Sequence, residues 1–416
     1  MHILELPSFF PPHGGQFCLE QAKALKTMGH EVRIVSVVEL SLTKDRQFYF
    51  TALWQEERME MEGVEVFRLY MRAVPKAVRR NISHWTELCK KAVERYVRLY
   101  GKPDVLHAHC CKNAGLAARA ISEQFGIPFF ITEHLSSGLF ERDFGKGWQR
   151  HAWLKEEMRR TYEAAACVIP VSGELEDDLA PFFGKAYHHQ VISNIVDTDF
   201  FCPSLTPDPS PVGEGSGLLV SPLSHGRGVG GEARSVVRFC CLALADIYGK
   251  GYDVLAEAMQ YLPESVELHI AGQGTDSPAM QKLFQVPFSH WRGVRGEASH
   301  SRVHLYGFLD KVGVRDLLWQ SDALVLPSRS EAQPLVVLEA LATGIPAVAT
   351  ESVPASLRIP GAVLIAPIGD ARALAEKMKE AMDIKPSADY CEAVRRLASP
   401  AVVAEKLTRL FESAIP

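Results

Sequence analysis

The feature that most constrains the fold is a repeated alternation of short apolar strands with helices. At the start of the chain, strands are expected at residues 2–6 and 31–38. Between them lie a loop with Gly14 and Gly15 and a helix expected over 17–28. Strand, glycine-containing loop, helix and strand in this order open a parallel α/β unit. The sequence therefore predicts a Rossmann-like domain at the start of the chain.

The alternation continues through the first half and restarts in the second. Further strands of the first series are expected at 104–108, 128–132, 168–171 and 190–192, with a helix over 114–125. The second series has expected strands at 239–244, 267–271, 303–306, 323–326 and 347–349, and helices at 253–261, 314–320 and 335–342. Such a rhythm predicts two doubly wound α/β domains with parallel sheets.

Length and composition give the expected domain boundaries. A chain of 416 residues is too long for a single hydrophobic core and has a length typical of two domains. We expect an N-terminal domain over 1–201 and a C-terminal domain over 236–399, with a last helix, 401–413, that packs back onto the N-terminal domain. Residues 202–235 are rich in Gly, Pro and Ser and predict a low-complexity insertion or linker. A second insertion is expected at about 286–300.

The two insertions share a repeat. Residues 224–233 resemble residues 289–298, and each copy interrupts the α/β rhythm. We interpret both as inserted loops, and a basic RNA-binding loop is the alternative. The formal net charge of −5 gives no support for nucleic acid as the main partner. No nucleic-acid partner is therefore expected.

Several features predict a cytoplasmic location. The N-terminus has no cationic start and no long apolar run, and Pro7 follows soon. No stretch approaches the roughly 20 apolar residues that span a bilayer. The nine cysteines show no zinc-ligand spacing, which favours free thiols in a reducing compartment.

Residues 74–102 predict a basic helix with Trp85 and Tyr96 on an apolar face. Such a helix can rest on an anionic membrane, which would place the protein peripherally at the inner membrane face. A solvated helix packed on the sheet is the favoured interpretation.

Two glutamates, Glu331 and Glu339, flank the start of an expected helix. Pro334 suits the first turn of that helix, and Gly344 and Pro346 end it. Glu331 is thus expected in the preceding loop and Glu339 within the helix. Backbone N–H groups at a helix start can receive a phosphate or a sugar hydroxyl, and a carboxylate suits a ribose diol. The alternative is two solvated acids beside a core helix.

The surrounding motifs resemble one enzyme family. They are residues 302–309 with 321–331, 11–15 with 29–32, 106–109, 131–134 and 193–199. Together they resemble the retaining glycosyltransferases of family 4 (glycosyl transferases group 1), which have the GT-B fold. The resemblance runs from Met1 to about Asp370, apart from the insertions. It implies two Rossmann-like doubly wound domains facing a cleft.

The resemblance also implies roles for the paired glutamates and the residues between them. Glu339 would hold the donor ribose, and Glu331 would contact the transferred sugar. The residues that would offer backbone groups to sugar or phosphate are Ala332, Gln333, Pro334 and Leu335, of which Pro334 cannot donate. Gln333 stands where the family often has an aromatic residue.

Further roles are implied elsewhere. The base-binding turn would be Gly307, Phe308 and Leu309. Gly14 and Gly15 would let a loop of the first domain approach the diphosphate closely. His109 would lie near the reacting centre, and the alternative is a strand-end histidine whose partner is the backbone.

Lys250 matches a lysine that neutralises the leaving diphosphate. The family usually has an arginine five residues earlier, and here that position is Ala245. This removes one cation from the expected clamp. A glycine pair expected after the strand at Ala347 is also absent, with residues 351–354 in its place.

Two short motifs carry no functional prediction. Asp197 and Asp199 have the form of a metal-binding pair, but we expect capping or linker packing. Gly272 and Gly274 follow a strand and predict a tight turn.

The implied activity is transfer of a sugar from a nucleotide-sugar donor to an unknown acceptor: a glycan, a lipid-linked molecule or a small molecule. The resemblance implies retention of anomeric configuration, with no bound metal or cofactor. A nucleotide-sugar epimerase and a non-catalytic sugar-nucleotide binder are the alternatives.

Overall fold

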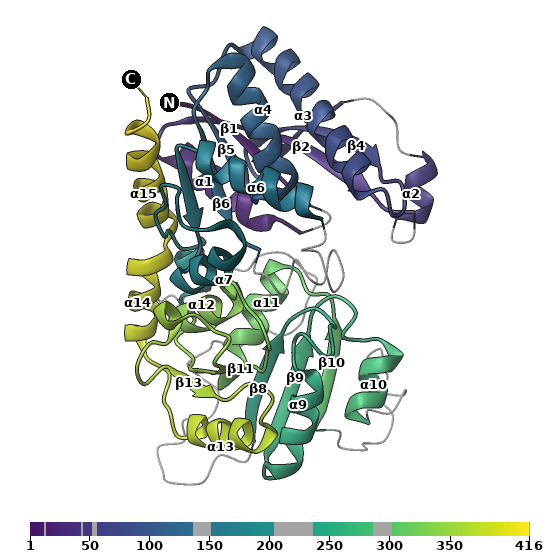
Figure 1. Ribbon diagram of the computed structural model, residues 1–416. Coiled ribbons are helices and arrows are strands. Elements are labelled where there is room, and N and C mark those ends of the chain that lie inside the picture. Colours follow the sequence, from purple (N-terminus) through teal and green to yellow (C-terminus); the bar gives the residue numbers. More distant parts are fainter. Residues whose placement is uncertain are drawn as a thin grey trace, which may run out of the picture. The chain divides into compact units, whose positions relative to one another are not determined.

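The computed structural model describes residues 1–11, 14–42, 45–51, 56–135, 151–203, 236–285 and 302–415. The repeat and all but the first two residues of the first predicted insertion lie outside these ranges, as does the second insertion. The chain divides into unit 1, Met1–Ile195 with Leu397–Pro416, and unit 2, Val196–Arg396. Each is a sheet with helices on both faces, as predicted (Figure 1).

Unit 1 contains a seven-stranded sheet in the order β3-β4-β2-β1-β5-β6-β7. All neighbouring strands are parallel except β3 and β4, which are antiparallel. The strands are β1 (His2–Pro7), β2 (Glu31–Leu40), β3 (Glu57–Met61), β4 (Val64–Arg72), β5 (Val105–His109), β6 (Phe129–Glu133) and β7 (Cys167–Pro170).

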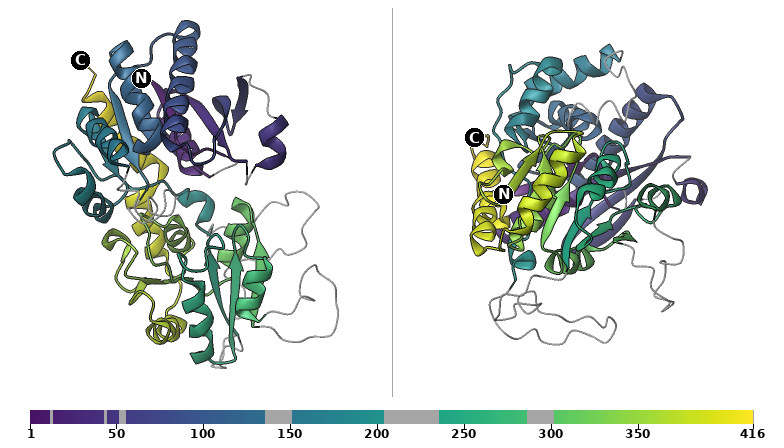
Figure 2. Two further views of the ribbon diagram at one scale, coloured as in Figure 1. Left: turned by 45° about the vertical axis from the view of Figure 1, so that its right-hand side comes forward. Right: turned by 90° about the horizontal axis from the view of Figure 1, so that it is seen from below.

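The helices of unit 1 cover both faces of this sheet. They are α1 (Gln16–Thr27), α2 (Arg46–Thr51), α3 (Val78–Tyr100), α4 (Leu116–Phe125), α6 (Ala152–Ala164), α7 (Gly173–Phe183) and α15 (Pro400–Glu412). An irregular turn, Cys111–Gly115, precedes α4, and its backbone is not helical at Lys112 and Asn113. α15 packs along α1, and Phe411 of α15 lies 4.7 Å from Phe130 of β6, ring centre to ring centre. α3, α4 and α6 pack beside one another on the other face (Figures 1 and 2).

Unit 2 contains a six-stranded parallel sheet in the order β10-β9-β8-β11-β12-β13. The strands are β8 (Val237–Leu242), β9 (Val266–Ala271), β10 (Val303–Gly307), β11 (Ala323–Leu326), β12 (Ala347–Thr350) and β13 (Val363–Ala366). The helices are α8 (Thr198–Phe201), α9 (Tyr252–Ala258), α10 (Pro278–Phe284), α11 (Lys311–Trp319), α12 (Leu335–Ala342), α13 (Ala371–Met382) and α14 (Ala388–Ala398). Short 3-10 turns lie at Met259–Tyr261 and Ala355–Leu357. A core of apolar side chains from β8 and β9 packs under α9 and α13.

Two local predictions were wrong. Residues 190–192 form no strand: they run extended beside β7, with the amides of Gln190 and Ile192 bonded to carbonyls of that strand at 3.0 and 3.2 Å. These two hydrogen bonds do not continue into the regular pairing of a strand. Pro334 precedes the first turn of α12 instead of lying in it, because its ψ of 110° is extended.

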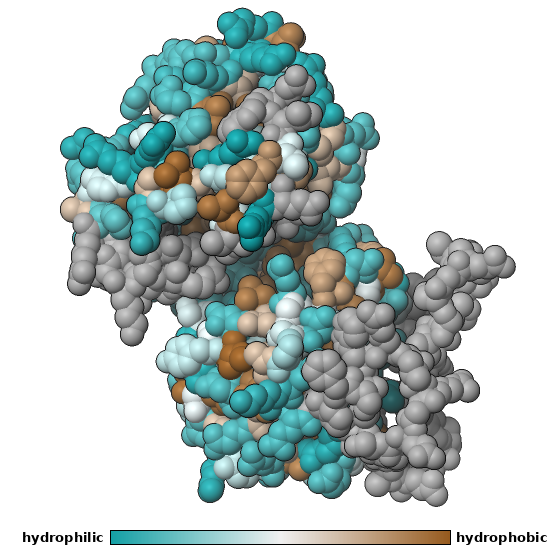
Figure 3. All heavy atoms as spheres, turned by 90° about the vertical axis from the view of Figure 1, so that its right-hand side faces the viewer, coloured by the Kyte–Doolittle hydropathy of each residue, from teal (hydrophilic) through white to brown (hydrophobic). Residues whose placement is uncertain are grey.

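The predicted basic helix is α3, and its apolar face packs inside unit 1. Trp85 is fully buried and its indole N–H donates to the Val37 carbonyl at 3.0 Å, and Tyr96 is also buried. This confirms a helix packed on the sheet. None of the described helices combines the length and the apolar character that crossing a bilayer requires. On the face drawn in Figure 3, hydrophilic and apolar residues are interspersed over both units. Membrane contact stays a prediction.

Phe411→Ala tests how far unit 1 depends on α15. Phe411 is fully buried against Phe130 and His107, so truncation should leave a cavity. We expect the free energy of unfolding to fall by about 3–5 kcal/mol, measured by urea denaturation. Arg409→Ala in the same helix is the control, because Arg409 is exposed and pairs with its helix neighbour Glu405. Equal losses in both variants would contradict the packing argument.

Candidate functional site

Each sheet reverses its strand order between two central strands. In unit 2 the reversal lies between β8 and β11, and in unit 1 it lies between β1 and β5. In open α/β sheets, ligands bind outside the carboxyl ends of the strands at such a point, because the two loops turn away from each other. Lys250 follows β8 and Glu331 follows β11. Gly14 and Gly15 follow β1, and His109 ends β5.

The loop that carries Lys250 is held against the chain that leaves β11. Gly251 has a φ of 69°, and a side-chain carbon there would lie 2.0 Å from the carbonyl oxygen of Pro327. Only glycine allows this close approach. The Lys250 amide donates to the Asp246 carbonyl at 2.9 Å, and the Gly249 amide donates to the Asp246 carboxylate at 3.0 Å. The loop therefore places Lys250 beside the second switch-point strand.

Lys250 and Glu331, predicted to act on the same donor, form an ion pair. The Lys250 Nζ lies 2.7 Å from the Glu331 Oε1, and the two side chains are 22% and 10% exposed. Glu331 lies in the loop before α12 and Glu339 lies within α12, as predicted. Pro334, the residue that precedes α12, has no polar side chain with which to cap the first turn. In unit 2 the structure thus assembles one cation, one carboxylate and a helix start at the switch point.

Arg329 joins the same two loops. Its backbone amide donates to the Gly249 carbonyl at 2.9 Å, and its guanidinium binds both carboxylate oxygens of Asp253 at 2.8 Å. The guanidinium also lies 4.1 Å from the ring centre of Tyr248. Arg329 thus ties the Lys250 loop to the chain that follows β11.

The predicted base-binding turn ends β10. Gly307 has a φ of 70°, its amide donates to the Thr275 hydroxyl at 3.1 Å, and its carbonyl accepts from the Gly272 amide at 2.7 Å. Phe308 is 77% exposed, and Leu309 is partly buried. The turn is thus fixed to the loop after β9 while its aromatic side chain faces outward.

In unit 1, the two predicted glycines adopt the left-handed conformation. Gly14 has a φ of 87°. Apart from its chain neighbours, no described residue has an atom within 4 Å of the point where a side-chain carbon of Gly14 would lie. Gly15 has a φ of 77°, and a side-chain carbon there would lie 2.0 Å from the Phe9 carbonyl oxygen. Gly15 is therefore required by the turn itself.

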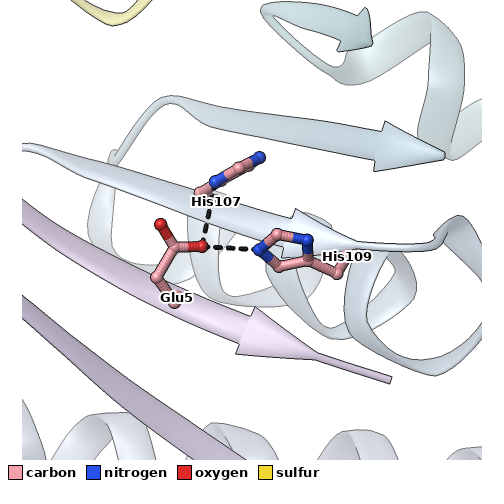
Figure 4. Close-up of side chains that lie close together, drawn as sticks. All are labelled: Glu5, His107 and His109. Carbon is pink, nitrogen blue, oxygen red and sulfur yellow. Dashed lines mark hydrogen bonds and ion pairs between the residues drawn. The ribbon is translucent and has the colours of Figure 1, made fainter. Parts of the chain in front are cut away.

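His109 is fully buried, and its partners are side chains. Its Nε2 lies 2.8 Å from the Glu5 Oε2, and its Nδ1 lies 3.3 Å from the Nε2 of His134. The Nδ1 of His107 lies 2.9 Å from the same Glu5 oxygen (Figure 4). Burial opposes the charged form of Glu5, but the two imidazoles outweigh it and lower its pKa to about 2. Glu5 is therefore an anion inside the unit.

A second buried carboxylate fixes the chain around His109. Glu133 accepts from the amides of Cys111, His134 and Leu135 at 2.9 to 3.0 Å and from the Tyr162 hydroxyl at 2.8 Å. Burial still raises the pKa of Glu133, although these bonds oppose the shift. Just after His109, two non-glycine residues have positive φ, namely Cys110 at 70° and Asn113 at 67°. Strain of this kind gathers at functional sites.

Two groups of side chains among the described residues could hold a metal ion. Glu5, His107 and His109 form one such group, and Glu267, His269 and His304 form another, on β9 and β10. Neither group includes the acids of the Asp197 motif. Asp197 caps α8 by accepting from the Phe200 amide at 3.1 Å, and it pairs with Lys311 at 3.2 Å, so the capping prediction is confirmed.

No sequence pattern identified Glu5, His134 as a ring partner, or Arg329. The one available signal for Glu5 was an acid in an otherwise apolar strand. His134 lay in a quoted motif without an assigned role. Arg329 carried no signal, because its partner Asp253 lies 76 residues away.

Both units match families of known proteins. The family pattern "Glycosyl transferase 4-like domain" matches residues 14–195, and "Glycosyl transferases group 1" matches residues 237–383. The chain is 25% identical over 362 residues to a putative teichuronic acid biosynthesis glycosyltransferase of Bacillus subtilis, covering 84% of this chain and 81% of that protein.

Solved structures share the fold along the whole chain. Sucrose-phosphate synthase from Thermosynechococcus elongatus superposes with a TM-score of 0.73 at 18% identity, covering 99% of both chains. Anabaena Alr3699/HepE in complex with UDP-glucose superposes with a TM-score of 0.67 at 14% identity, covering 99% of this chain and 100% of that one. With both units matched by glycosyltransferase families, this chain belongs to the glycosyltransferases of the GT-B fold.

Proposed function

We propose that this glycosyltransferase moves a sugar from a nucleotide-sugar donor with retention of configuration and without a bound metal ion. The observation that carries the proposal is the Lys250–Glu331 pair at the switch point of unit 2. A cation and a carboxylate fixed together there can serve the leaving diphosphate and the sugar hydroxyls of one donor. The UDP-glucose complex of the Anabaena protein supports a nucleotide-sugar donor.

Lys250 is assigned to the leaving diphosphate. Its side chain is paired with Glu331, and both side chains are largely shielded from water. A diphosphate must therefore compete with Glu331 for this cation. Once Lys250 turns to the phosphate, Glu331 becomes available to accept from sugar hydroxyls. The pair thus couples phosphate binding to the exposure of the sugar-binding carboxylate.

The other assignments follow from position. Glu339 within α12 is assigned to the donor ribose, and the loop from Ala332 to Leu335 is assigned to sugar or phosphate through its backbone. The exposed Phe308 and its neighbours in the turn after β10 are assigned to the base. Gly14 and Gly15, both with left-handed backbone, are assigned to the diphosphate.

The chemistry proposed is front-face displacement, in which the leaving diphosphate is stabilised by Lys250 and by backbone dipoles. With Ala245 in place of a second cation and Arg329 neutralised by Asp253, Lys250 carries this role without a neighbouring arginine. The acceptor is assigned to unit 1, and its identity is left open. We place the reaction in the cytoplasm.

Lys250→Ala should lower turnover more than donor affinity. Charge on the diphosphate grows as the glycosidic bond breaks, and only interactions that are stronger in the transition state raise the rate. We expect kcat to fall on the order of a hundredfold, with a smaller change in the Michaelis constant, in steady-state assays. Lys282→Ala, on α10, is the control. Unchanged turnover in Lys250→Ala would move the role to another residue.

Glu339→Gln and Glu331→Gln should impair different properties of the enzyme, namely nucleotide binding and turnover. Glu339→Gln weakens a charge-assisted bond to ribose, so free nucleoside diphosphate should bind less tightly by about 1–3 kcal/mol. Glu331→Gln releases Lys250, so the same ligand should bind as tightly or more tightly while turnover falls. Calorimetry with UDP and GDP separates the two variants without knowledge of the acceptor.

The control for this pair is Glu376→Gln, because Glu376 is an exposed acid of α13. Two results would count against the assignments. If Glu339→Gln binds the diphosphate like wild type, Glu339 does not hold the ribose. If Glu331→Gln alone weakens binding, the two roles are reversed.

Chelation tests the metal-independent assignment. Because Lys250 and backbone groups are assigned to the diphosphate, sugar transfer should continue at the same rate in EDTA. The measurement is initial rate with and without chelator, followed by addition of manganese. Loss of activity in EDTA with recovery in manganese would overturn the assignment.

A further inference from the structure

Three side chains that can bind a metal ion lie together on one face of the unit 2 sheet. Glu267 and His269 are two positions apart in β9, so they project from the same face. His304 of the neighbouring strand β10 is in register with His269, which adds a second imidazole to that face. The ring centres of the two histidines lie 4.6 Å apart. Backbone pairing therefore brings these three residues, the β9–β10 cluster, to one place.

The cluster faces away from the hydrophobic core of unit 2. Leu268 and Ile270 of β9 and Val303 of β10 belong to that core. Side chains alternate between the two faces along a strand, so the residues between them lie on the opposite face. All three members of the cluster are partly exposed. An ion can therefore reach them from the solvent.

The His269 ring has one satisfied nitrogen and one that lacks a hydrogen bond. Its Nδ1 lies 2.8 Å from the Tyr306 hydroxyl oxygen. Its Nε2 is buried, has no hydrogen-bond partner among the described residues, and lies 3.5 Å from the Glu267 Oε2. That separation exceeds a normal hydrogen bond. A buried nitrogen without a partner is costly, and a cation between the imidazole and the carboxylate would satisfy both groups.

The separations in the cluster suit zinc. Zinc binds histidine nitrogen and carboxylate oxygen at about 2.0–2.2 Å in a tetrahedron, which places neighbouring ligand atoms about 3.3 Å apart. The Glu267–His269 separation of 3.5 Å is close to this, and one ligand atom from each member lies within 4.8 Å of the others. The Tyr306 hydroxyl orients the ring from the far side, as outer partners of metal-bound histidines do. Magnesium and calcium prefer oxygen ligands and fit two imidazoles poorly.

We propose that Glu267, His269 and His304 form a zinc site that joins β10 to β9, with water as the fourth ligand. Its role is structural: β10 ends the strand order of this sheet and leads into the turn at Gly307. The site goes beyond the proposed function and does not rest on it, because its ligands lie within strands and Lys250 lies in a loop after β8.

Arg238 of β8 competes with the ion. Its Nε lies 3.3 Å from the Glu267 Oε2, the oxygen that faces His269. A guanidinium beside the site repels a second cation and occupies an oxygen that zinc uses. Arg238→Gln should therefore tighten zinc binding by about threefold, which is the size of effect expected for a partly exposed charge pair. Weaker binding in Arg238→Gln would contradict the assignment of Glu267 as a ligand.

The main test is calorimetry with zinc chloride on the full-length protein after removal of metal by EDTA and dialysis. We expect wild type to bind zinc at the cluster, and its melting temperature to rise by about 5 °C at zinc concentrations a hundred times the Kd. Loss of an outer partner costs about 10–100-fold in metal affinity, so loss of a ligand in His304→Gln or Glu267→Gln should cost about a hundredfold or more. His84→Gln, which changes an exposed histidine of α3, is the control and should bind zinc like wild type.

Equal zinc affinity in wild type and His304→Gln, or an equal loss in His84→Gln, would overturn the proposal. If His304→Gln does not fold, ¹⁵N-histidine spectra of wild type decide, because zinc must shift the Nε2 signal of His269. An unshifted signal at saturating zinc would exclude the site. Loss of the donor-site effects at Lys250 and Glu339 with zinc binding intact would instead reject the proposed function.

Discussion

The order of strands in the two sheets is the constraint on which the sites depend. Right-handed crossovers make each half of a sheet grow away from the first strand, so the loops after two central strands diverge. In unit 2 these loops carry Lys250 and Glu331, and in unit 1 they carry Gly14 and follow His109. The close approach of Gly251 to Pro327 and the hydrogen bond from the Arg329 amide to Gly249 then hold the two unit 2 loops in contact with each other.

The two units place a carboxylate in opposite surroundings. In unit 2 the carboxylate of Glu331 is paired with a cation near the surface, where a ligand can exchange partners with it. In unit 1 the carboxylate of Glu5 faces imidazoles inside a core, where no solvent reaches it. Burying an ion is costly, and an apolar residue in a central strand is often as stable or more stable. In the core of unit 1, the contacts of the Glu5 carboxylate with His107 and His109 offset this cost.

Much of the fold could be predicted from the sequence, because its signals are local. Apolar runs and glycines indicated the central strands of both sheets, and Gly344 and Pro346 marked the end of α12 near Glu339. The antiparallel edge of unit 1 was missed because β3 alternates between exposed and partly buried residues and has no apolar run. Residues 190–192 were assigned to a strand because their composition is apolar, although they make only alternate bonds to β7.

The site was predictable only where it lies in one stretch of chain. Glu331 and Glu339 are eight positions apart, in the loop before α12 and within α12, so one short stretch of chain fixes their relation. The partnership of Lys250 with Glu331 spans 81 residues, and that of Glu5 with His109 spans 104. No periodic pattern connects such pairs, since strand order brings them together. The family resemblance supplied Lys250 and Glu331 but not the residues that orient them.

The docking of α15 on unit 1 has a consequence for biosynthesis. Unit 2 is inserted between Ile195 and Leu397, so the ribosome completes the whole of unit 2 before it makes the helix that covers β6 and His107. Until Phe411 leaves the exit tunnel, the nascent first sheet has one apolar face uncovered beside α1. Unit 1 therefore completes this face only after α15 has been synthesised, and not in the simple order of translation.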